Sequence, residues 1–428
     1  MMADFLENLR WRGMIHDITP GTEAQLKKEQ TTAYIGFEPT GPSLHIGNLA
    51  TIMLLRHFQL AGHKPLVLVG GATGMIGDPA GKAAERKLLS QEELHYNQTC
   101  ISNQLSRFID FSASKNAAVL LNNIDWFQGF GFLNFLREVG KHIPINYMIA
   151  KDSVKRRLES GISFAEFSYQ LLQGYDFFHL YTNHGVKLQM GGADQWGNLT
   201  TGIELIRKKA GKEAFALTTP LITKADGSKF GKSEQGNIWL DPAMTSPYAF
   251  YQFWLNCADE EASQLIKVFT LLNQAEIDCL LQAHQASPHQ RILQQAIAKE
   301  LTILVHSKAD YLQATKASTL LFGQATQTDL CALSEKDFLT IFASVPQIKI
   351  TQEQLAGTAN IADLLTKETQ ATIFTSKAEV RRMVQAGGLS INKEKVTDFT
   401  QKPAYKLLQD KYLLIQKGKK HYYLIIVV

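Results

Sequence analysis

Short apolar runs alternate with longer, mixed apolar and polar stretches near the start of the chain. Residues 33–37 and 64–70 are short and mostly apolar, as buried strands are. Residues 45–60 between them have the length of a helix, and Gly62 provides its C-terminal stop. A strand, a helix and a strand in this order predict a βαβ unit, and therefore a parallel sheet with helices on both faces. Ligands of such sheets bind at the carboxyl ends of the strands.

The rest of the pattern predicts further domains, because 428 residues exceed what one hydrophobic core holds. Residues 186–190 add a buried strand, and residues 248–322 are helical without strand-like alternation. We expect a Rossmann-like α/β domain at 1–220 with a helical insertion at about 125–160, a mobile lysine-containing loop and linker at 221–247, an α-helical domain at 248–322, a linker at 323–362, and a small α+β domain at 363–428.

The charge is unevenly distributed. The chain has a formal net charge of +4, yet residues 363–428 contain 12 Lys/Arg and only 6 Asp/Glu, so this tail carries +6 and the remainder −2. A basic domain is typical of an RNA contact, although a solvated basic surface gives the same count. The four scattered cysteines predict neither disulfides nor a zinc site. Without a signal-like N-terminus or a run of ~18–20 apolar residues, we expect a cytoplasmic protein.

Two segments that contain glycine predict contacts with an anion. The segment 34–48 has the sequence Tyr-Ile-Gly-Phe-Glu-Pro-Thr, and then Leu-His-Ile-Gly-Asn at the start of the expected helix. The first turn of a helix presents unpaired N–H groups and the positive end of the dipole, and His45 adds a donor there. The segment 229–233, Lys-Phe-Gly-Lys-Ser, supplies two lysines on a loop.

Two further patterns are open to two interpretations each. The glycine-dense stretch 70–82 fits no nucleotide fingerprint; Lys82 and Arg86 behind it would share a helical face, toward either a phosphate chain or solvent. Tyr169, Gln173 and Asp176 also fall on one helical face. A phenol, an amide and a carboxylate can bind the hydroxyl and ammonium groups of a ligand, or they can form a polar part of the core.

A histidine-glycine turn and a late Lys-x-x-Lys-Ser loop together resemble the class I aminoacyl-tRNA synthetases. With Gly-Gly-Ala-Asp-Gln-Trp-Gly-Asn at 191–198, the chain resembles the bacterial-type tyrosyl-tRNA synthetases over nearly its whole length. The resemblance implies a homodimer, formed through the aromatic insertion, that activates L-tyrosine with ATP and Mg²⁺ to tyrosyl-adenylate and then charges tRNA(Tyr). It also implies anticodon recognition by the helical domain and RNA binding by the tail.

The resemblance also implies roles for individual residues. Tyrosine would be bound by Tyr34, Asp78, Asn123, Tyr169, Gln173, Asp176 and Gln195. ATP would be bound by Gly36, Glu38, Thr40, His45, Gly47, Asn48, Gly192, Asp194 and Lys232. Catalysis would rest on Thr40, His45, Lys82, Arg86, Lys229, Lys232 and Ser233, and no residue is expected to hold a metal. RNA would be bound by Lys377, Arg381, Arg382, Lys417 and Lys419.

Two positions depart from the common family pattern. Asn48 stands where a second histidine is usual, and Glu38 is one methylene longer than the frequent aspartate. Two alternatives remain. A tryptophanyl-tRNA synthetase shares the fold and both nucleotide motifs, but Tyr34, Asp176 and the basic tail argue against it. An RNA-binding protein with an inactive synthetase body is disfavoured by the intact His45 and lysine motifs.

Overall fold

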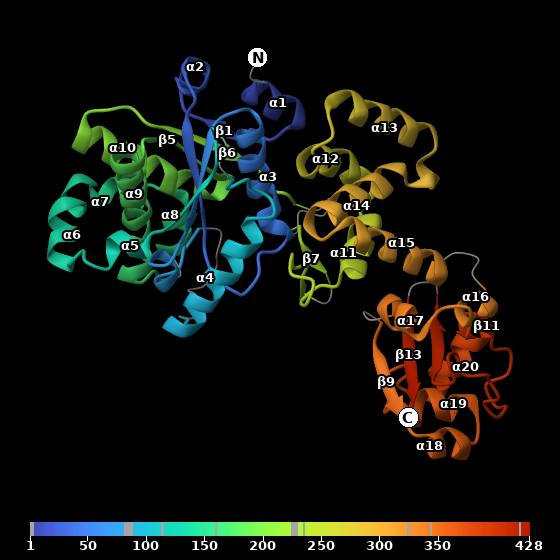
Figure 1. Cartoon of the computed structure of the whole chain (residues 1–428). Coiled ribbons are helices and arrows are strands. Elements are labelled where there is room, and N and C mark those ends of the chain that lie inside the picture. Colours follow the sequence, from blue (N-terminus) through green and yellow to red (C-terminus); the bar gives the residue numbers. More distant parts are fainter. Residues whose placement is uncertain are drawn as a thin grey trace. The chain divides into compact units, whose positions relative to one another are not determined.

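The computed structural model describes residues 4–80, 89–112, 115–158, 161–223, 230–233, 236–322, 326–342, 345–418 and 421–428. The chain divides into two compact units (Figure 1). Unit 1 consists of Met1–Thr245 and Trp254–Val305, and unit 2 of Ser246–Phe253 and His306–Val428. Helix α11 (Pro247–Leu255) contributes to both units.

Unit 1 is built on a six-stranded sheet with the strand order β1-β6-β5-β2-β3-β4. The strands are β1 (Asp17–Ile18), β2 (Thr32–Phe37), β3 (Lys64–Val69), β4 (Val119–Asn122), β5 (Val186–Gly192) and β6 (Phe215–Thr219). Only the short β1 runs antiparallel to its neighbour. The parallel sheet and the strands predicted at 33–37, 64–70 and 186–190 are confirmed.

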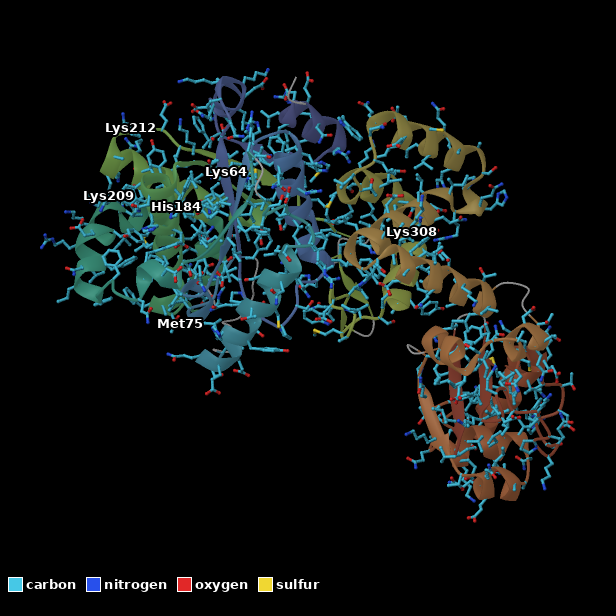
Figure 2. The ribbon with its side chains drawn as sticks, in the orientation of Figure 1. Lys64, Met75, His184, Lys209, Lys212 and Lys308 are labelled. Carbon is cyan, nitrogen blue, oxygen red and sulfur yellow. The ribbon has the colours of Figure 1, made fainter. Side chains whose placement is uncertain are left out.

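The direction in which successive strands are added to the sheet reverses between β2 and β5. From β2 the chain continues through β3 to β4 on one side, whereas β5 and β6 lie on the other side. Such a switch point leaves a crevice at the carboxyl ends of the two central strands. Figure 2 labels Lys64, which begins β3, and Met75, which lies in the loop after it, and so shows the edge of the sheet that carries these ends.

Helices cover both faces of this sheet (Figure 1). They are α1 (Phe5–Arg12), α2 (Thr22–Lys28), α3 (Ile46–Leu60), η1 (Thr73–Met75), α4 (Gln91–Leu105), α5 (Ile124–Phe127), α6 (Phe132–Glu138), η2 (Gly140–His142), α7 (Ile145–Ile149), α8 (Asp152–Leu158), α9 (Phe164–His184), η3 (Ala193–Gln195) and α10 (Trp196–Ala210). The remaining elements of unit 1 are β7 (Lys232–Ser233), β8 (Gly236–Asn237), α12 (Asp259–Phe269), α13 (Gln274–Ala286), η4 (Pro288–Gln290) and α14 (Ile292–Val305).

One apolar core joins α9 and α10 to the sheet. Tyr34 and Leu68 from the strands pack with Phe177 of α9 and Ile206 of α10. Two glycines permit this close approach: a Cβ on Gly202 would lie 2.8 Å from the Phe177 side chain, and one on Gly174 would lie 3.2 Å from Thr201. Because α9 is pressed against the sheet, its inner face is fixed relative to β2.

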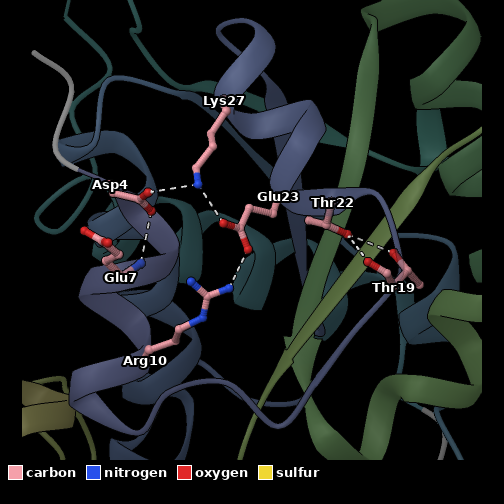
Figure 3. A network of polar contacts seen from close by, with 7 residues as sticks. All are labelled: Asp4, Glu7, Arg10, Thr19, Thr22, Glu23 and Lys27. Carbon is pink, nitrogen blue, oxygen red and sulfur yellow. Dashed lines mark hydrogen bonds and ion pairs between the residues drawn. The ribbon is translucent and has the colours of Figure 1, made fainter.

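The N-terminal helix α1 is held by ion pairs at the surface and by hydrogen bonds in the interior. On the surface, Glu23 of α2 binds Arg10 and Lys27, and Lys27 also lies near Asp4 (Figure 3). In the interior, the Arg12 side chain is only 3% exposed. Its guanidinium donates to the carbonyl oxygens of three residues at and beyond the end of α12, at 2.6–2.9 Å. These carbonyls are Lys267, Thr270 and Leu272.

Unit 2 contains a five-stranded sheet with the order β11-β10-β12-β13-β9. The strands are β9 (Gln347–Ile350), β10 (Leu389–Ile391), β11 (Glu394–Lys395), β12 (Tyr412–Lys417) and β13 (His421–Val427). The helices of this unit are α15 (Lys308–Phe322), α16 (Gln327–Cys331), α17 (Glu335–Ile341), α18 (Gln352–Gly357), α19 (Ile361–Asp363), the π-helical η5 (Leu364–Glu368) and α20 (Lys377–Gln385). Two apolar cores pack against the sheet, one with α19, η5 and α20 and one with α15, α16 and α17.

The linker predicted at 323–362 is wrong for the residues that the structure describes there. This segment forms α16, α17 and α18, and its strand β9 pairs in parallel with β13. Phe338 and Phe342 are fully buried against the sheet. The segment was missed because its apolar residues complete the core of a distant strand and show little periodicity of their own.

Within the described residues, we find no helix with the length and apolar character needed to cross a bilayer.

We predict that Arg12→Met destabilises unit 1 by about 2–4 kcal/mol, because it leaves one buried and two partly buried carbonyls without their charged donor. Burial lowers the pKa of Arg12 to about 10, so the side chain is still charged at neutral pH. Thermal unfolding followed by circular dichroism measures the effect. The matched control is Arg10→Met on the same helix, where an exposed ion pair contributes little. Equal melting temperatures for the two variants would contradict the role of Arg12.

Candidate functional site

A cavity of about 490 Å³ opens at the carboxyl ends of β2 and β5. It is lined by residues of both strands, of the first turn of α3, of the loop after β3, and of α9. The predicted residues that line it are Tyr34, Gly36, Glu38, Thr40, His45, Gly47, Asn48, Asp78, Tyr169, Gln173, Asp176, Gly192, Asp194 and Gln195. Tyr34 and Gln195, 161 positions apart in the sequence, therefore line one cavity at the switch point of the sheet.

A buried carboxylate forms one end of the cavity. Asp176 Oδ1 accepts a hydrogen bond from Trp126 Nε1 at 2.8 Å, and Oδ2 accepts one from Asn123 Nδ2 at 3.1 Å. Burial raises the pKa of Asp176 to about 8, while these two donors act in the opposite direction. Asn123 is thus placed behind Asp176 and is not among the residues that line the cavity.

The Tyr34 hydroxyl lies at the same end. The side chain is 1% exposed, and its oxygen has no hydrogen-bond partner among the described residues. Burial and the nearby Asp176 raise the pKa of Tyr34 well above its ordinary value, so the phenol keeps its proton. A buried hydroxyl without a partner is costly, and a ligand hydroxyl that reached it would remove this cost.

A second group of polar side chains lies along the cavity. Asp78 Oδ2 accepts a hydrogen bond from Gln195 Nε2 at 2.6 Å, and Asn198 Nδ2 lies 3.4 Å from Asp78 Oδ1. The Tyr169 hydroxyl donates to Glu38 Oε1 at 2.6 Å. This group contains the carboxylates of Asp78 and Glu38, and a carboxylate oxygen accepts from the N–H groups of an ammonium.

The start of α3 forms the mouth of the cavity. His45 is the N-cap, and its Nδ1 accepts the Gly47 N–H at 3.0 Å. The Asn48 amide oxygen accepts the His45 N–H at 3.1 Å and closes a capping box. Asn48, which replaces the usual histidine, therefore has a structural role at the helix start that its motif position did not reveal.

The two nucleotide motifs meet at this helix start. Residues 238–240 pair with 44–46, and a Cβ on Gly231 would lie 3.0 Å from Ile46 and 3.4 Å from the Gly47 nitrogen. Gly231 has φ +96°, a conformation that favours glycine. Phe230 before it is buried against Trp254 and Phe269.

Glycine keeps one wall of the cavity open. A Cβ on Gly36 would meet no atom within 4 Å, although Gly36 lines the cavity between β3 and β5. A flat ligand group can therefore approach the backbone of β2 there. Gly70 and Gly192 are crowded instead, since a Cβ there would lie 2.5 Å from Thr73 Oγ1 and 2.8 Å from Asp194 Oδ1, respectively.

Some predicted site residues lie outside the described residues or have no described side chain. Lys82, Arg86, Lys229 and Lys419 belong to the first group. Lys232 and Ser233 form β7, and only their backbone is described. The helical face expected for Lys82 and Arg86 therefore remains a prediction.

The basic residues of the tail are not equivalent. Lys377 binds Asp363 at 2.5 Å, and Lys417 binds Glu379 at 2.7 Å. Lys393, another lysine of the basic tail, is half-buried and donates to the Leu321 carbonyl oxygen. By contrast, Arg381 and Arg382 are exposed on α20.

Several cavity residues were missed by sequence reasoning. Gln189 on β5 lines the cavity with a buried amide oxygen that has no partner among the described residues. Trp126, Asn198 and Trp239 also take part in the site. The polar Gln189, between Leu188 and Met190 in a strand expected to be buried, was the signal that could have been noticed. In the described part of the chain, no three His, Cys, Asp or Glu side chains gather as metal ligands.

Comparisons with known proteins agree with this geometry. A model of the class I tRNA synthetases for tryptophan and tyrosine (W and Y) matches residues 26–323, and a model of the tyrosine–tRNA ligase SYY-like C-terminal domain matches residues 337–425. The tyrosine–tRNA ligase of Amoebophilus asiaticus is 71% identical over 99% of both chains. That of Cytophaga hutchinsonii is 58% identical over the same shares.

A solved structure shows the same likeness in three dimensions. The C-terminally truncated mitochondrial tyrosyl-tRNA synthetase of Aspergillus nidulans is 29% identical, with a TM-score of 0.67, and the match covers 74% of this chain and 94% of that one. The chain belongs to the class I tRNA synthetases of the tryptophan and tyrosine type, and within them to the bacterial-type tyrosine–tRNA ligases.

Proposed function

We propose that the cavity of unit 1 is where this tyrosine–tRNA ligase activates L-tyrosine with its substrate ATP. A carboxylate oxygen of tyrosine attacks the α-phosphorus of ATP, the bond to the β-phosphate oxygen breaks, and tyrosyl-adenylate and pyrophosphate form. A hydroxyl of the 3′-terminal ribose of tRNA(Tyr) then attacks the tyrosyl carbonyl carbon, and AMP leaves. The observation that carries the proposal is the unpartnered Tyr34 hydroxyl beside the buried Asp176.

The Tyr34 and Asp176 end suits the tyrosine side chain. A substrate phenol has one proton to donate and two lone pairs. It can donate to the Asp176 carboxylate and accept from Tyr34, which satisfies both buried groups together. Phenylalanine leaves the Tyr34 hydroxyl without a partner and gives Asp176 no further donor, and tryptophan would have to place an indole N–H there. The α-ammonium would then reach Asp78, Tyr169 and Gln173 farther along the cavity.

The α3 end suits the triphosphate. The N–H groups and dipole of α3 favour anionic phosphate, and Thr40 and His45 line the same mouth. Lys232 and Ser233 follow Gly231, whose backbone lies against this turn. Lys82, Arg86 and Lys229 are proposed for the departing pyrophosphate. The base and ribose would lie along Gly36, Gly192 and Asp194.

Positioning and charge stabilisation would provide most of the rate. Transfer of a nucleotidyl group needs an aligned nucleophile and donors for the charge that develops on phosphate. Mg²⁺ would enter with ATP, bound mainly by phosphate oxygens and water, and would neutralise phosphate charge.

We predict that Tyr34→Phe weakens the preference for tyrosine over phenylalanine about tenfold, because one partner of the substrate hydroxyl is lost. Amino-acid-dependent ATP–pyrophosphate exchange, run with tyrosine, phenylalanine and tryptophan, measures this preference. The melting temperature should not fall, since the Tyr34 hydroxyl has no partner to lose among the described residues. Exchange with tryptophan alone would reject the proposed specificity, and a folded protein without any exchange would reject the activity.

We further propose a homodimer. Four apolar side chains are 62–78% exposed on α6, α7 and the first turn of α9, namely Phe132, Leu133, Ile145 and Phe164. They lie over the aromatic core of the insertion, which includes Phe135 and Met148. A concentration of exposed apolar surface of this kind marks a protein interface.

We predict that Phe164→Asp converts the dimer to monomers at micromolar concentration, because a carboxylate would be buried without a partner. Sedimentation velocity measures the change. Leu60→Asp, at an exposed leucine outside this surface, is the control and should leave the dimer intact. A wild-type monomer at this concentration would refute the proposal.

We also propose that the tail binds tRNA, chiefly through the exposed Arg381 and Arg382, together with Lys377, Lys417 and Lys419. Phosphate contacts of this kind position RNA and depend on salt. The helical segment 248–322 is proposed for anticodon recognition.

Arg381→Glu combined with Arg382→Glu should raise the KM for tRNA about tenfold at low salt, because two phosphate contacts become repulsive. Aminoacylation kinetics at two salt concentrations measure this change, and the difference should shrink at high salt. Lys349→Glu, which reverses one exposed charge on the edge strand β9, is the control for charge reversal elsewhere in the tail. An unchanged KM in the arginine variant would count against the RNA surface.

A further inference from the structure

Glu38 is engaged by a residue of the proposed amino-acid site. Its carboxylate accepts the Tyr169 hydroxyl at 2.6 Å, and Tyr169 is 3% exposed. The two residues come from the end of β2 and from α9, 131 positions apart. Family resemblance places Glu38 beside adenosine, yet this contact connects it to the other substrate.

The donors and acceptors that Tyr169 and Glu38 carry determine which of the two donates the proton. A phenol has a single proton to donate, whereas a carboxylate can only accept. Because Tyr169 gives its proton to Glu38, only oxygen lone pairs remain for a ligand. An ammonium group can only donate. The Glu38 contact therefore makes Tyr169 an acceptor that matches an ammonium and repels a second acceptor.

The carboxylate of Glu38 is held in place by its surroundings. A Cβ on Gly70 would lie 2.7 Å from Glu38 Oε1, and one on Gly74 would lie 3.2 Å from Oε2. These glycines leave the space that the longer side chain occupies. An aspartate would withdraw the carboxylate by about one C–C bond, roughly 1.5 Å, which is enough to break a 2.6 Å contact.

We propose that Glu38 is a positioning residue for the α-ammonium of tyrosine, which acts by fixing the Tyr169 hydroxyl as an acceptor. The proposal rests on the proposed function of the cavity. It adds to Asp78 and Gln173 a residue that need not touch tyrosine itself. It also explains why this chain has a glutamate at position 38, whose extra methylene lets the carboxylate reach the Tyr169 hydroxyl.

Binding of two ligands to the full-length protein tests the proposal. L-tyrosine carries the ammonium, and 3-(4-hydroxyphenyl)propanoate lacks it. Glu38→Ala should raise the Kd of tyrosine about tenfold and that of the analogue less than about twofold. Glu38→Asp should behave like Glu38→Ala, whereas Glu38→Gln should lose less, because its amide oxygen can still accept the Tyr169 proton.

The background Tyr169→Phe separates positioning from direct contact. There, Glu38→Ala should cause almost no further loss of tyrosine binding, because no hydroxyl remains to be oriented. An equal loss in both backgrounds would overturn the proposal. So would a large rise in the KM for ATP, measured by pyrophosphate exchange, with an unchanged Kd for tyrosine.

The controls separate the proposed role of Glu38 from the proposed activity of the cavity. Glu213→Ala removes an exposed glutamate away from the cavity and should change neither Kd. If Glu38→Ala does not fold, the comparison of Glu38→Asp with Glu38→Gln decides alone, and equal tyrosine affinity in these two would overturn the proposal. Absence of exchange in the wild type would reject the activity, while the two Kd values would still decide the role of Glu38.

Discussion

The need to bury a carboxylate at the end of the cavity governs the arrangement of unit 1. Asp176 on α9 is acceptable in the interior because Asn123, after β4, and Trp126, on α5, both donate to it. The three positions can meet only if α9 lies against the sheet and the chain returns from β4 beneath it. Tyr34 on β2 lines the same cavity and packs against Phe177, the residue after Asp176 on α9. The hydrogen bonds of a single buried carboxyl group thus connect α9 to α5 and to the end of β4.

Different kinds of polar groups follow one another from the inner end of the cavity to its mouth. Its inner end has a phenol and a carboxylate, its middle has Glu38 and Asp78, and its mouth has the positive end of α3. A zwitterionic aromatic amino acid next to a polyphosphate has the complementary order of groups. The Arg12 bonds to the end of α12 add support from outside, because α12 also packs against α3 and against Phe230 of the lysine motif.

Sequence reasoning recovered the parallel sheet, the helix after the first turn, and 14 of the residues that line the cavity. The strands and the helix were recovered because strand length and glycine stops are local properties, whereas the site residues came from the resemblance to the synthetase family. Sequence reasoning failed at 326–362, where α16, α17 and β9 are stabilised by contacts with distant strands. It also could not tell Lys393, which holds the Leu321 carbonyl, from Arg381, which faces solvent. A count of charged residues does not show which of them are already bonded within the fold.

The sequence alone determined which residue types are present at which spacing, and with them the βαβ unit, the histidine-glycine start of the helix after it and the Tyr-Gln-Asp face. Tertiary structure alone decided which groups pair. In the folded chain, Asn48 accepts the N–H of the N-cap residue His45, Asn123 donates to Asp176, and Glu38 accepts from Tyr169. The reason is physical: helical and strand periods act over a few residues, whereas a hydrogen bond across 131 positions exists only once the sheet has brought its carboxyl ends together.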